Sequence, residues 1–229
     1  MSLRIAFDLD GVLADMDGEL ARRARKLFGT AEPVPAGKRT SVDPGVPPTR
    51  LKLSAYQLRR LWQQVQAVEN FWGTLREIEP GAVARLSAVA AERRWEVIFL
   101  TSRPQSAGEI AQVQTQRWLE SKGFSLPSVF VVQGSRGRIA SALALDVVVD
   151  DRLDNCLDVI GDSKARAVLV WREGAGRLPA SAKRMGVGVV RSVAECLDIL
   201  ADAEGIAKDQ GNIVSRVMRA LGRKQTASA

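Results

Sequence analysis

Polar residues that can do chemistry follow three buried apolar runs of this 229-residue chain. In chain order they are Asp8 and Asp10, Thr101 and Ser102, and Asp150 and Asp151. If the runs are parallel strands, their carboxyl ends meet at the sheet edge where open α/β proteins bind ligands. Four carboxylates at one edge repel each other unless a cation lies among them, and oxygen ligands favour Mg²⁺. Asp-Gly alone is typical of a turn and Asp-Asp of an exposed loop, but their combination in this order favours a metal-assisted site.

The composition narrows the chemistry further, because the chain contains no histidine. A Ser-His-Asp triad, a Cys-His pair, an HExxH zinc helix and a Cys₂His₂ finger all need imidazole. The two cysteines, Cys156 and Cys196, cannot form a four-thiolate metal site. If the protein is an enzyme, carboxylates must therefore carry out the proton transfer or the nucleophilic attack.

The elements that would position these residues alternate between strand and helix. Short apolar runs predict strands at 3–9, 97–100, 129–132, 147–149, 167–171 and 187–190. Helical patterns lie at 19–28, from Ser54 through Val68, from Pro80 through Ala90, and at 106–122, 139–145, 193–200 and 206–221. Alternation with short connections predicts an α/β fold with a Rossmann-like, doubly wound parallel sheet covered on both faces.

The region between the first two strands has a different composition. Five of the nine prolines lie in 31–49, which predicts a loop. Residues 19–60 contain ten basic and three acidic side chains, so this segment carries the whole formal charge of +7. The ten are Arg22, Arg23, Arg25, Lys26, Lys38, Arg39, Arg50, Lys52, Arg59 and Arg60. Such a segment is either a solvated helix face with a loop or a positive surface for a phosphate-bearing ligand.

Three short motifs resemble those of a known family. Asp-Leu-Asp-Gly-Val-Leu-Ala-Asp at 8–15, Leu-Thr-Ser at 100–102 and Val-Asp-Asp at 149–151 resemble motifs one, two and four of the haloacid dehalogenase (HAD) superfamily, whose members are mostly Mg²⁺-dependent phosphatases. The Thr-Ser-Arg-Pro run and a following Trp118-Leu119 are most similar to the 5′(3′)-deoxyribonucleotidase-like branch. The resemblance covers a core of residues 1–14 and 76–200.

This resemblance implies a role for each motif residue. Asp8 would be the nucleophile that forms an aspartyl-phosphate, because its carboxylate is already ionised at neutral pH. Asp10 would protonate the leaving oxygen and then activate water. Thr101 and Ser102 would bind the transferring phosphoryl group. The resemblance also implies a set of Mg²⁺ ligands, which are Asp8, the backbone carbonyl of Asp10, and Asp151, with Asp150 acting indirectly or through water.

The third motif departs from the family pattern. It usually supplies a lysine, but no lysine lies between Lys122 and Lys164, and the spacing indicates Arg136, with Arg138 as the second candidate. Arginine can hold the charge and bind phosphate bidentately, although its fork is larger than an ammonium group. Arg103 is either a substrate-binding residue or a surface residue at the start of a helix.

The family places a helical cap where this chain has residues 15–75, and we expect a small helical cap there. A cap excludes water and supplies substrate contacts. A basic cap over an acidic, metal-loaded floor would bind an anionic substrate. The aromatic residues of this segment either stack on a base or form the core of the cap; they are Tyr56, Trp62, Phe71 and Trp72. Residues 201–229 are expected to form a C-terminal helix and a basic tail.

Two functions follow as hypotheses. The first is a Mg²⁺-dependent phosphomonoester hydrolase for a small phosphorylated substrate, with a nucleotide as one candidate. The second is a HAD-fold binding or regulatory protein with weak or no phosphatase activity, which contacts nucleic acid or an acidic partner through its basic cap and tail. No apolar run is long enough to span a membrane, and the sparse cysteines and early Asp8 predict a cytoplasmic protein. The oligomeric state does not follow from these patterns.

Overall fold

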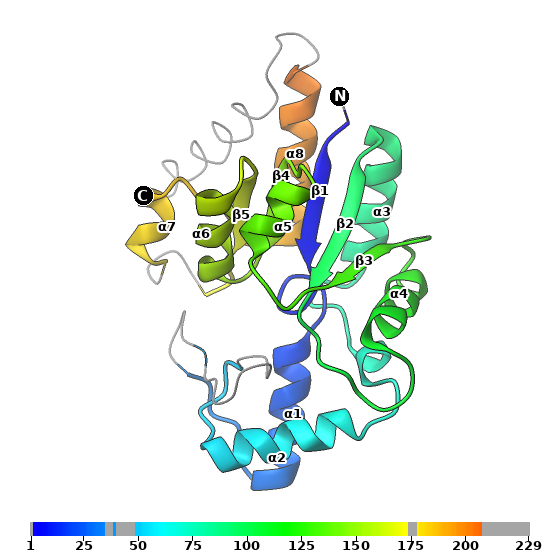
Figure 1. Cartoon of the computed structure of the whole chain (residues 1–229), viewed down its shortest axis with the longest axis vertical. Helices are drawn as coiled ribbons and strands as arrows, with labels where there is room; N and C mark the ends of the chain where they lie inside the picture. The colour runs from blue at the N-terminus through cyan, green and yellow to red at the C-terminus, as the bar shows by residue number, and fades with distance from the viewer. Residues whose placement is uncertain (1, 35–38, 40–48, 174–177, 208–229) are drawn as a thin grey trace.

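A parallel β-sheet forms the centre of the molecule (Figure 1). The computed structural model describes residues 2–34, 39, 49–173 and 178–207. Within them the sheet has six strands in the order β3-β2-β1-β4-β5-β6. Their bounds are β1 Arg4–Asp8, β2 Glu96–Thr101, β3 Ser128–Val131, β4 Val147–Asp150, β5 Arg166–Val170 and β6 Gly188–Val190. The strand order reverses between β1 and β4, and such a switch point is where doubly wound proteins bind ligands.

Helices cover both faces of this sheet, as expected for nearly continuous apolar strands. Their bounds are α1 Met16–Phe28, α2 Ala55–Gln66, α3 Ala82–Arg93, α4 Ala111–Ser121, α5 Arg136–Ala142, α6 Leu153–Asp162, α7 Ala180–Arg184 and α8 Val193–Ala207, with a short 3₁₀ helix, η1, at Phe71–Thr74. Side chains alternate between two buried clusters along each strand. Phe7 packs into the cluster under α3, α4 and α8, whereas the adjacent Ala6 packs into the cluster under α5, α6 and α7.

Residues 15–75, a part of the chain between β1 and β2, are called the insert below, and its described residues lie beyond the carboxyl ends of the strands (Figure 1). Ser54 begins α2 with a capping box, since its hydroxyl accepts from Gln57 N and the Gln57 side chain accepts from Ser54 N. Leu58 and Trp62 of α2 are buried in the same apolar cluster as β1. The insert therefore packs directly onto the core, next to the strand ends.

The predicted α/β fold is confirmed, and each predicted strand is present to within two residues at either end. The predicted helix at 106–122 is shorter, because it begins only at Ala111. The preceding chain instead bonds to the insert: Asn70 N donates to Ala107 O at 2.8 Å, and Asn70 Oδ1 accepts from Glu109 N at 3.0 Å. Ile110, which directly precedes this helix, has an exposed side chain.

Other helices also differ from expectation. The helix predicted at 139–145 begins at Arg136, because the Ser135 hydroxyl accepts a hydrogen bond from Arg138 N. Helices α6 and α7 were not predicted. The helix expected at 206–221 lies almost entirely outside the described residues, as do the basic tail and most of the proline-rich loop. Among the helices that the structure describes, none is both long and apolar enough to cross a membrane.

Candidate functional site

Three buried aspartates converge at the switch point between β1 and β4. Asp8 is the last residue of β1, Asp150 is the last of β4, and Asp151 follows it. The two strands are hydrogen-bonded neighbours, with Phe7 opposite Val149, so Asp8 and Asp150 emerge side by side. One carboxylate oxygen from each of the three lies within 4.8 Å of the others. The sequence-predicted convergence of these carboxylates is thus a feature of the fold.

The turn after β1 approaches this cluster very closely at Gly11. Its φ of +96° is in the left-handed region that favours glycine. A Cβ atom added at Gly11 would lie 2.2 Å from Asp151 Oδ2. The Asp-Gly pair therefore does form a turn, and its glycine also leaves room for the Asp151 carboxylate.

Asp8 has a cationic partner in Arg136, which begins α5. Arg136 Nη2 donates to Asp8 Oδ1 at 2.8 Å and to Ser102 Oγ at 3.2 Å. Burial and the nearby Asp150 raise the pKa of Asp8 well above its usual value, while Arg136 opposes this shift. Arg136, the first of the two arginines considered for the third motif, is thus the cation that pairs with Asp8.

The close contact of α5 with α6 allows Arg136 to reach Asp8. A Cβ atom at Gly137 would lie 2.2 Å from the carbonyl oxygen of Asp158 on α6, so only glycine fits between the two helices there. The Asp158 carboxylate also accepts hydrogen bonds from Gly137 N at 3.0 Å and from Ser135 Oγ at 2.9 Å. The first turn of α5 is therefore held in place beside the carboxylate cluster.

The two adjacent aspartates differ in what they bind. Asp150 Oδ1 accepts from Arg152 N and its Oδ2 accepts from Asn155 Nδ2, both at 2.8 Å. Burial and the charge of Asp151 raise the pKa of Asp150 to about 6, although Arg136 opposes the shift. Asp151 Oδ1 is buried and has no hydrogen-bond partner among the described residues.

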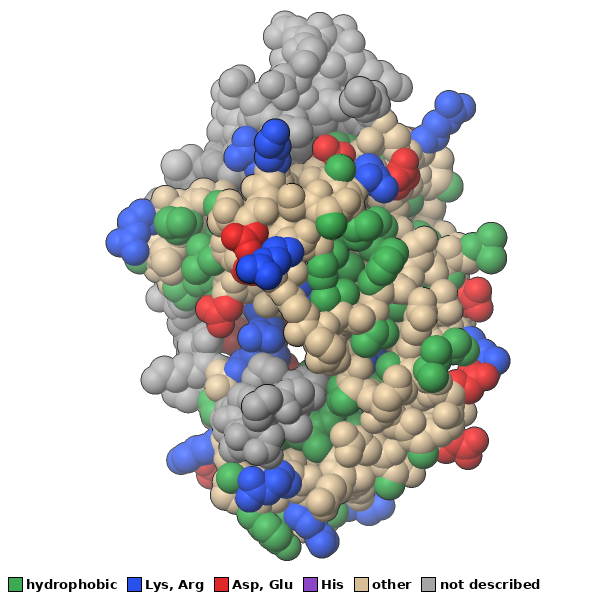
Figure 2. Space-filling model, viewed as in Figure 1, with side chains coloured by type: hydrophobic (Ala, Val, Ile, Leu, Met, Phe, Trp, Pro, Cys, Tyr) green, Lys and Arg blue, Asp and Glu red, His purple; other side chains and the backbone are tan. Residues whose placement is uncertain are grey.

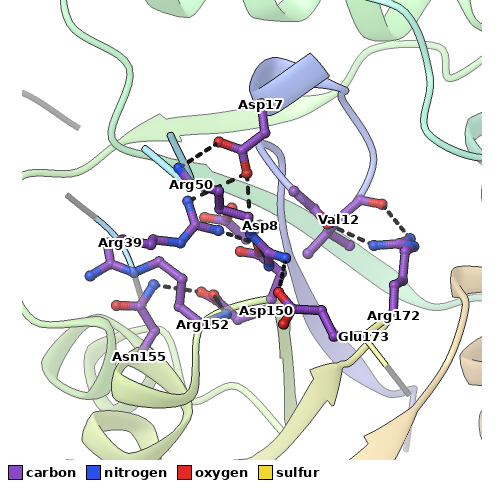
Figure 3. Close-up of polar contacts among 12 residues, drawn as sticks. Asp8, Val12, Asp17, Arg39, Arg50, Asp150, Arg152, Asn155, Arg172 and Glu173 are labelled. Carbon is purple, nitrogen blue, oxygen red and sulfur yellow. Dashed lines mark hydrogen bonds and ion pairs between the residues drawn. The ribbon is translucent and has the colours of Figure 1, made fainter. Parts of the chain in front are cut away.

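The other oxygen of Asp151 is bound by two arginines of the insert. Arg39 Nη2 pairs with Asp151 Oδ2, and Arg50 Nη2 lies 3.1 Å from the same oxygen. Arg50 also pairs with Asp17 Oδ2 at 3.3 Å and with Glu173 Oε1 at 2.5 Å. We call the three carboxylates of Asp8, Asp150 and Asp151 the acidic floor. Figure 3 shows Arg39 and Arg50 of the insert next to this floor, to which they supply positive charge.

Asp10 is held by a fully buried arginine. Arg103 donates from Nη2 to Asp10 Oδ1 at 2.8 Å and from Nε to Asp10 Oδ2 at 2.9 Å, and Thr101 Oγ1 donates to Asp10 Oδ2 at 3.2 Å. The guanidinium lies 4.9 Å from the centroid of the Trp72 ring in η1. Arg103 is therefore not the surface residue considered as an alternative, and it links Asp10 to the insert.

The structure brings eight of the nine sequence-predicted site residues together, and the exception is Arg138. Its side chain is 85% exposed and its Nε lies 3.9 Å from Asp162 Oδ2, away from Asp8. Of the two arginines considered for the third motif, Arg136 faces Asp8. The four aromatic residues considered for stacking on a base differ in burial. Trp62, Phe71 and Trp72 are buried, whereas Tyr56 is exposed.

The donor set fits a hard divalent cation. Three buried carboxylates lie within reach of one ion, and the unpartnered Asp151 Oδ1 is an oxygen that lacks the hydrogen bond a buried acceptor needs. Asp150, by contrast, already accepts two hydrogen bonds. This difference favours Asp151 over Asp150 as a direct ligand, and the assignment stays a prediction.

Several residues at the site were not assigned to it from the sequence. Arg39 and Arg50 were counted only as part of the basic segment, and Asp17, Arg152 and Asn155 were not considered. The excess of basic residues in 19–60 was the available signal for the two arginines. Most of the other basic side chains of that segment are exposed, and Figure 2 shows basic side chains spread over the surface around α1 and α2.

A small pocket of about 40 Å³ opens in front of Asp8. It is lined by Asp8, Asp10, Met16, Arg39, Ser102, Arg103, Arg136, Arg152 and Asn155. A second pocket, of about 190 Å³, is lined by residues that include Asp151, Arg50 and Arg172. The first pocket combines the candidate nucleophile with cationic side chains.

Comparison with solved structures finds this fold in hydrolases of the HAD family. A HAD-family hydrolase from Deinococcus radiodurans R1, with bound phosphate and sodium, has a TM-score of 0.59 at 17% identity and matches 89% of this chain and 96% of its own. A hydrolase from Pseudomonas syringae has a TM-score of 0.52 at 19% identity, with coverages of 90% and 100%. A haloacid dehalogenase-like hydrolase from Burkholderia xenovorans LB400 has a TM-score of 0.50 at 14% identity, with coverages of 88% and 97%.

No protein-family model matches the chain, and no curated protein matches it either. At the identities above, the structural likeness establishes the fold, which is that of HAD-type hydrolases. The 5′(3′)-deoxyribonucleotidase-like branch is not supported by these matches and stays a prediction.

Proposed function

We propose that this protein is a Mg²⁺-dependent phosphomonoester hydrolase of the HAD type. The observation that carries the proposal is the buried cluster of Asp8, Asp150 and Asp151, with Arg136 bound to Asp8. The HAD-type fold supports it, because Asp8 lies at the carboxyl end of the strand beside the switch point. The structural match that binds phosphate is consistent with a phosphate-handling site, although it concerns another protein.

In the proposed reaction Asp8 attacks the phosphorus atom of the substrate. A bond forms between its carboxylate oxygen and phosphorus while the ester bond breaks, and Asp10 gives a proton to the leaving oxygen. Water then attacks the aspartyl-phosphate and returns a proton to Asp10, which releases inorganic phosphate and the Asp8 carboxylate. Neither step requires an imidazole, in agreement with the absence of histidine.

The surrounding residues would stabilise charge in both steps. Arg136 is positioned to neutralise Asp8 and the arriving phosphoryl group, since its Nη1 is buried without a hydrogen-bond partner. Asp8, the backbone carbonyl of Asp10, Asp151 and, indirectly or through water, Asp150 would hold Mg²⁺, which when bound supplies positive charge to the phosphoryl oxygens. We also propose that the insert acts as the cap, because Arg39 and Arg50 reach the floor from it.

The substrate proposed from the sequence resemblance is a nucleotide. The described lining of the pocket in front of Asp8 contains no aromatic side chain on which a base could stack. A substrate panel should therefore include p-nitrophenyl phosphate, a nucleoside monophosphate and smaller phosphorylated acids, each with and without Mg²⁺.

The direct test replaces the candidate nucleophile. Asp8→Asn is expected to lower kcat for p-nitrophenyl phosphate by at least about 10⁴-fold, because catalysis would lose the attacking carboxylate. Asn is nearly isosteric and removes a buried charge, so thermal stability should not fall. The matched control is Asp154→Asn, an exposed aspartate in the first turn of α6, which should keep full activity. Unchanged turnover in Asp8→Asn would overturn the proposed mechanism.

A further inference from the structure

The pocket in front of Asp8 is unusually rich in arginine for its size. Four of the side chains that line its volume of about 40 Å³ are guanidinium groups, from Arg39, Arg103, Arg136 and Arg152. Only two aspartates, Asp8 and Asp10, line the same pocket. Such a pocket suits a compact ligand with more than one negative charge.

Three of these arginines already have carboxylate partners in the structure. Arg103 binds Asp10 and also donates to Thr115 Oγ1 at 2.9 Å. Arg39 pairs with Asp151 and Asp17. Arg136 pairs with Asp8, which leaves its buried Nη1 available to a phosphoryl oxygen.

Arg152 differs from the other three. Its backbone N–H donates to Asp150 Oδ1, which fixes the residue beside the carboxylate cluster. Its half-buried guanidinium makes no hydrogen bond or ion pair with another described residue. Among the residues that the structure describes, Arg152 therefore lines the pocket next to the candidate nucleophile without an anionic partner.

We propose that Arg152 forms a second anion subsite beside the phosphoryl position. The preferred substrate is then a compact phosphomonoester that carries a second anionic group, a carboxylate or another phosphate, close to the scissile ester. This inference rests on the proposed function for the position of the phosphoryl group. Arg136 binds the phosphoryl group and Arg152 binds the second anionic group, so the two arginines have separate roles.

The apolar residues near the pocket support this substrate class. Met16 is the only apolar side chain among its described lining residues. Trp62, Phe71 and Trp72 are buried within the insert and cannot offer a free ring face to a base. Recognition at this pocket therefore depends on charge.

The test compares binding of two non-hydrolysable ligands of similar size, 3-phosphonopropionate and propylphosphonate, which differ in one carboxylate. We expect calorimetry in the presence of Mg²⁺ to give an affinity about 10- to 100-fold higher for 3-phosphonopropionate, as one charge-assisted contact would give. Arg152→Gln should remove this preference and leave propylphosphonate binding unchanged. Arg152→Lys, which keeps the charge, should retain part of the preference.

The control is Arg60→Gln, which removes the same charge from an exposed position of α2 and should keep the full preference. Equal affinity of the native protein for both ligands would overturn the inference, and so would an equal loss for both ligands in Arg152→Gln. Because the readout is binding, it is independent of turnover. Absence of phosphatase activity with a retained preference would count against the proposed function alone.

Discussion

The acidic floor and the basic insert reach the same site in different ways. The floor carboxylates stand at the ends of β1 and β4, whose backbones are paired within one sheet. Arg39 and Arg50 of the insert lie outside helices and strands, in the chain between α1 and α2. The comparison shows that the backbone pairing of the sheet positions the floor carboxylates, whereas ion pairs with those carboxylates hold the two arginines of the insert.

The charges that form ion pairs around the floor do not balance. Among the described residues, ion pairs join five carboxylates, Asp8, Asp17, Asp150, Asp151 and Glu173, to three guanidiniums, Arg39, Arg50 and Arg136. Two formal negative charges are left, which one divalent cation would balance. This excess of negative charge favours the binding of Mg²⁺ at the floor even though arginines are nearby.

If the floor carries the chemistry, the largest effect after that of Asp8→Asn should come from removing the metal ligand Asp151. Asp151→Asn is expected to lower activity by about 10²- to 10³-fold, because the charge stabilisation that Mg²⁺ supplies would be lost. It should also abolish the rise in Tm on adding Mg²⁺, measured by thermal unfolding. Asp154→Asn again provides the control. A full Mg²⁺-induced rise in Asp151→Asn would remove Asp151 from the ligand set.

The next largest effect should follow from the close approach of the β1 turn to the floor. Gly11→Ala is expected to cost about 1–3 kcal/mol of stability and to lose activity, because a Cβ would displace the Asp151 carboxylate. Gly29→Ala is a matched control, since Gly29 also has a positive φ of +75° but a Cβ there meets nothing within 4 Å. Urea unfolding and Mg²⁺-dependent activity of both variants would separate backbone strain from the clash, and retained activity in Gly11→Ala would contradict the prediction.

The raised pKa values of Asp8 and Asp150 predict that metal binding depends on pH. Burial and mutual repulsion raise the pKa of Asp8 and bring that of Asp150 from 3.8 to about 6. Without metal, the proton that folded Asp150 retains contributes to the stability of the folded state. This contribution is fully present below pH 3.8, the ordinary pKa of Asp, and is lost as the pH rises through about 6. Metal binding needs the ionised carboxylates, so the rise in Tm caused by Mg²⁺ should be small at about pH 5 and larger at about pH 7.5.

Thermal unfolding with and without Mg²⁺ across this pH range would check the dependence. Asp150→Asn should flatten it, because the group with the raised pKa is removed. An equal Mg²⁺ effect at the two ends of the range would show that these carboxylates are not the ones that titrate with metal binding.

The smallest effect is expected from the insert. Arg50→Gln should raise the affinity for Mg²⁺ about 3- to 10-fold, because one of the two guanidiniums on Asp151 Oδ2 is removed. The side chain is 29% exposed, so solvent screens part of the interaction. Calorimetry should show no change for Arg60→Gln. A weaker Mg²⁺ affinity in Arg50→Gln would mean that the insert assists the cation rather than competing with it.

Much of the floor could be predicted from the sequence because its parts are local. Asp8 and Asp10 follow an apolar strand directly, and strand ends in a parallel sheet share one edge. The early start of α5 was missed, because its Ser135 cap outweighed the apolar pattern that pointed to 139–145. The late start of α4 was missed because bonds to Asn70, far along the chain, replace the first helical turn.

The insert could be predicted only as a charged segment. Its composition indicated an anionic ligand, but composition does not say which of ten basic residues reaches the site. The contacts of Arg103 show the same limit. Its burial between Asp10, Thr115 and the Trp72 ring depends on packing between η1 and α4, and nothing in the Thr-Ser-Arg-Pro run distinguishes that from a surface position.

By itself, the sequence determined the alternation of strands and helices, the aspartates at the strand ends and the absence of imidazole chemistry. These follow from short-range patterns, since hydrophobic periodicity and motif spacing act over a few residues. Only the tertiary structure decided which cations serve those aspartates. Arg136 meets Asp8 across 128 positions, and Arg39 and Arg50 meet Asp151 across 112 and 101. Such pairs form only after the sheet, α5 and the insert have packed together.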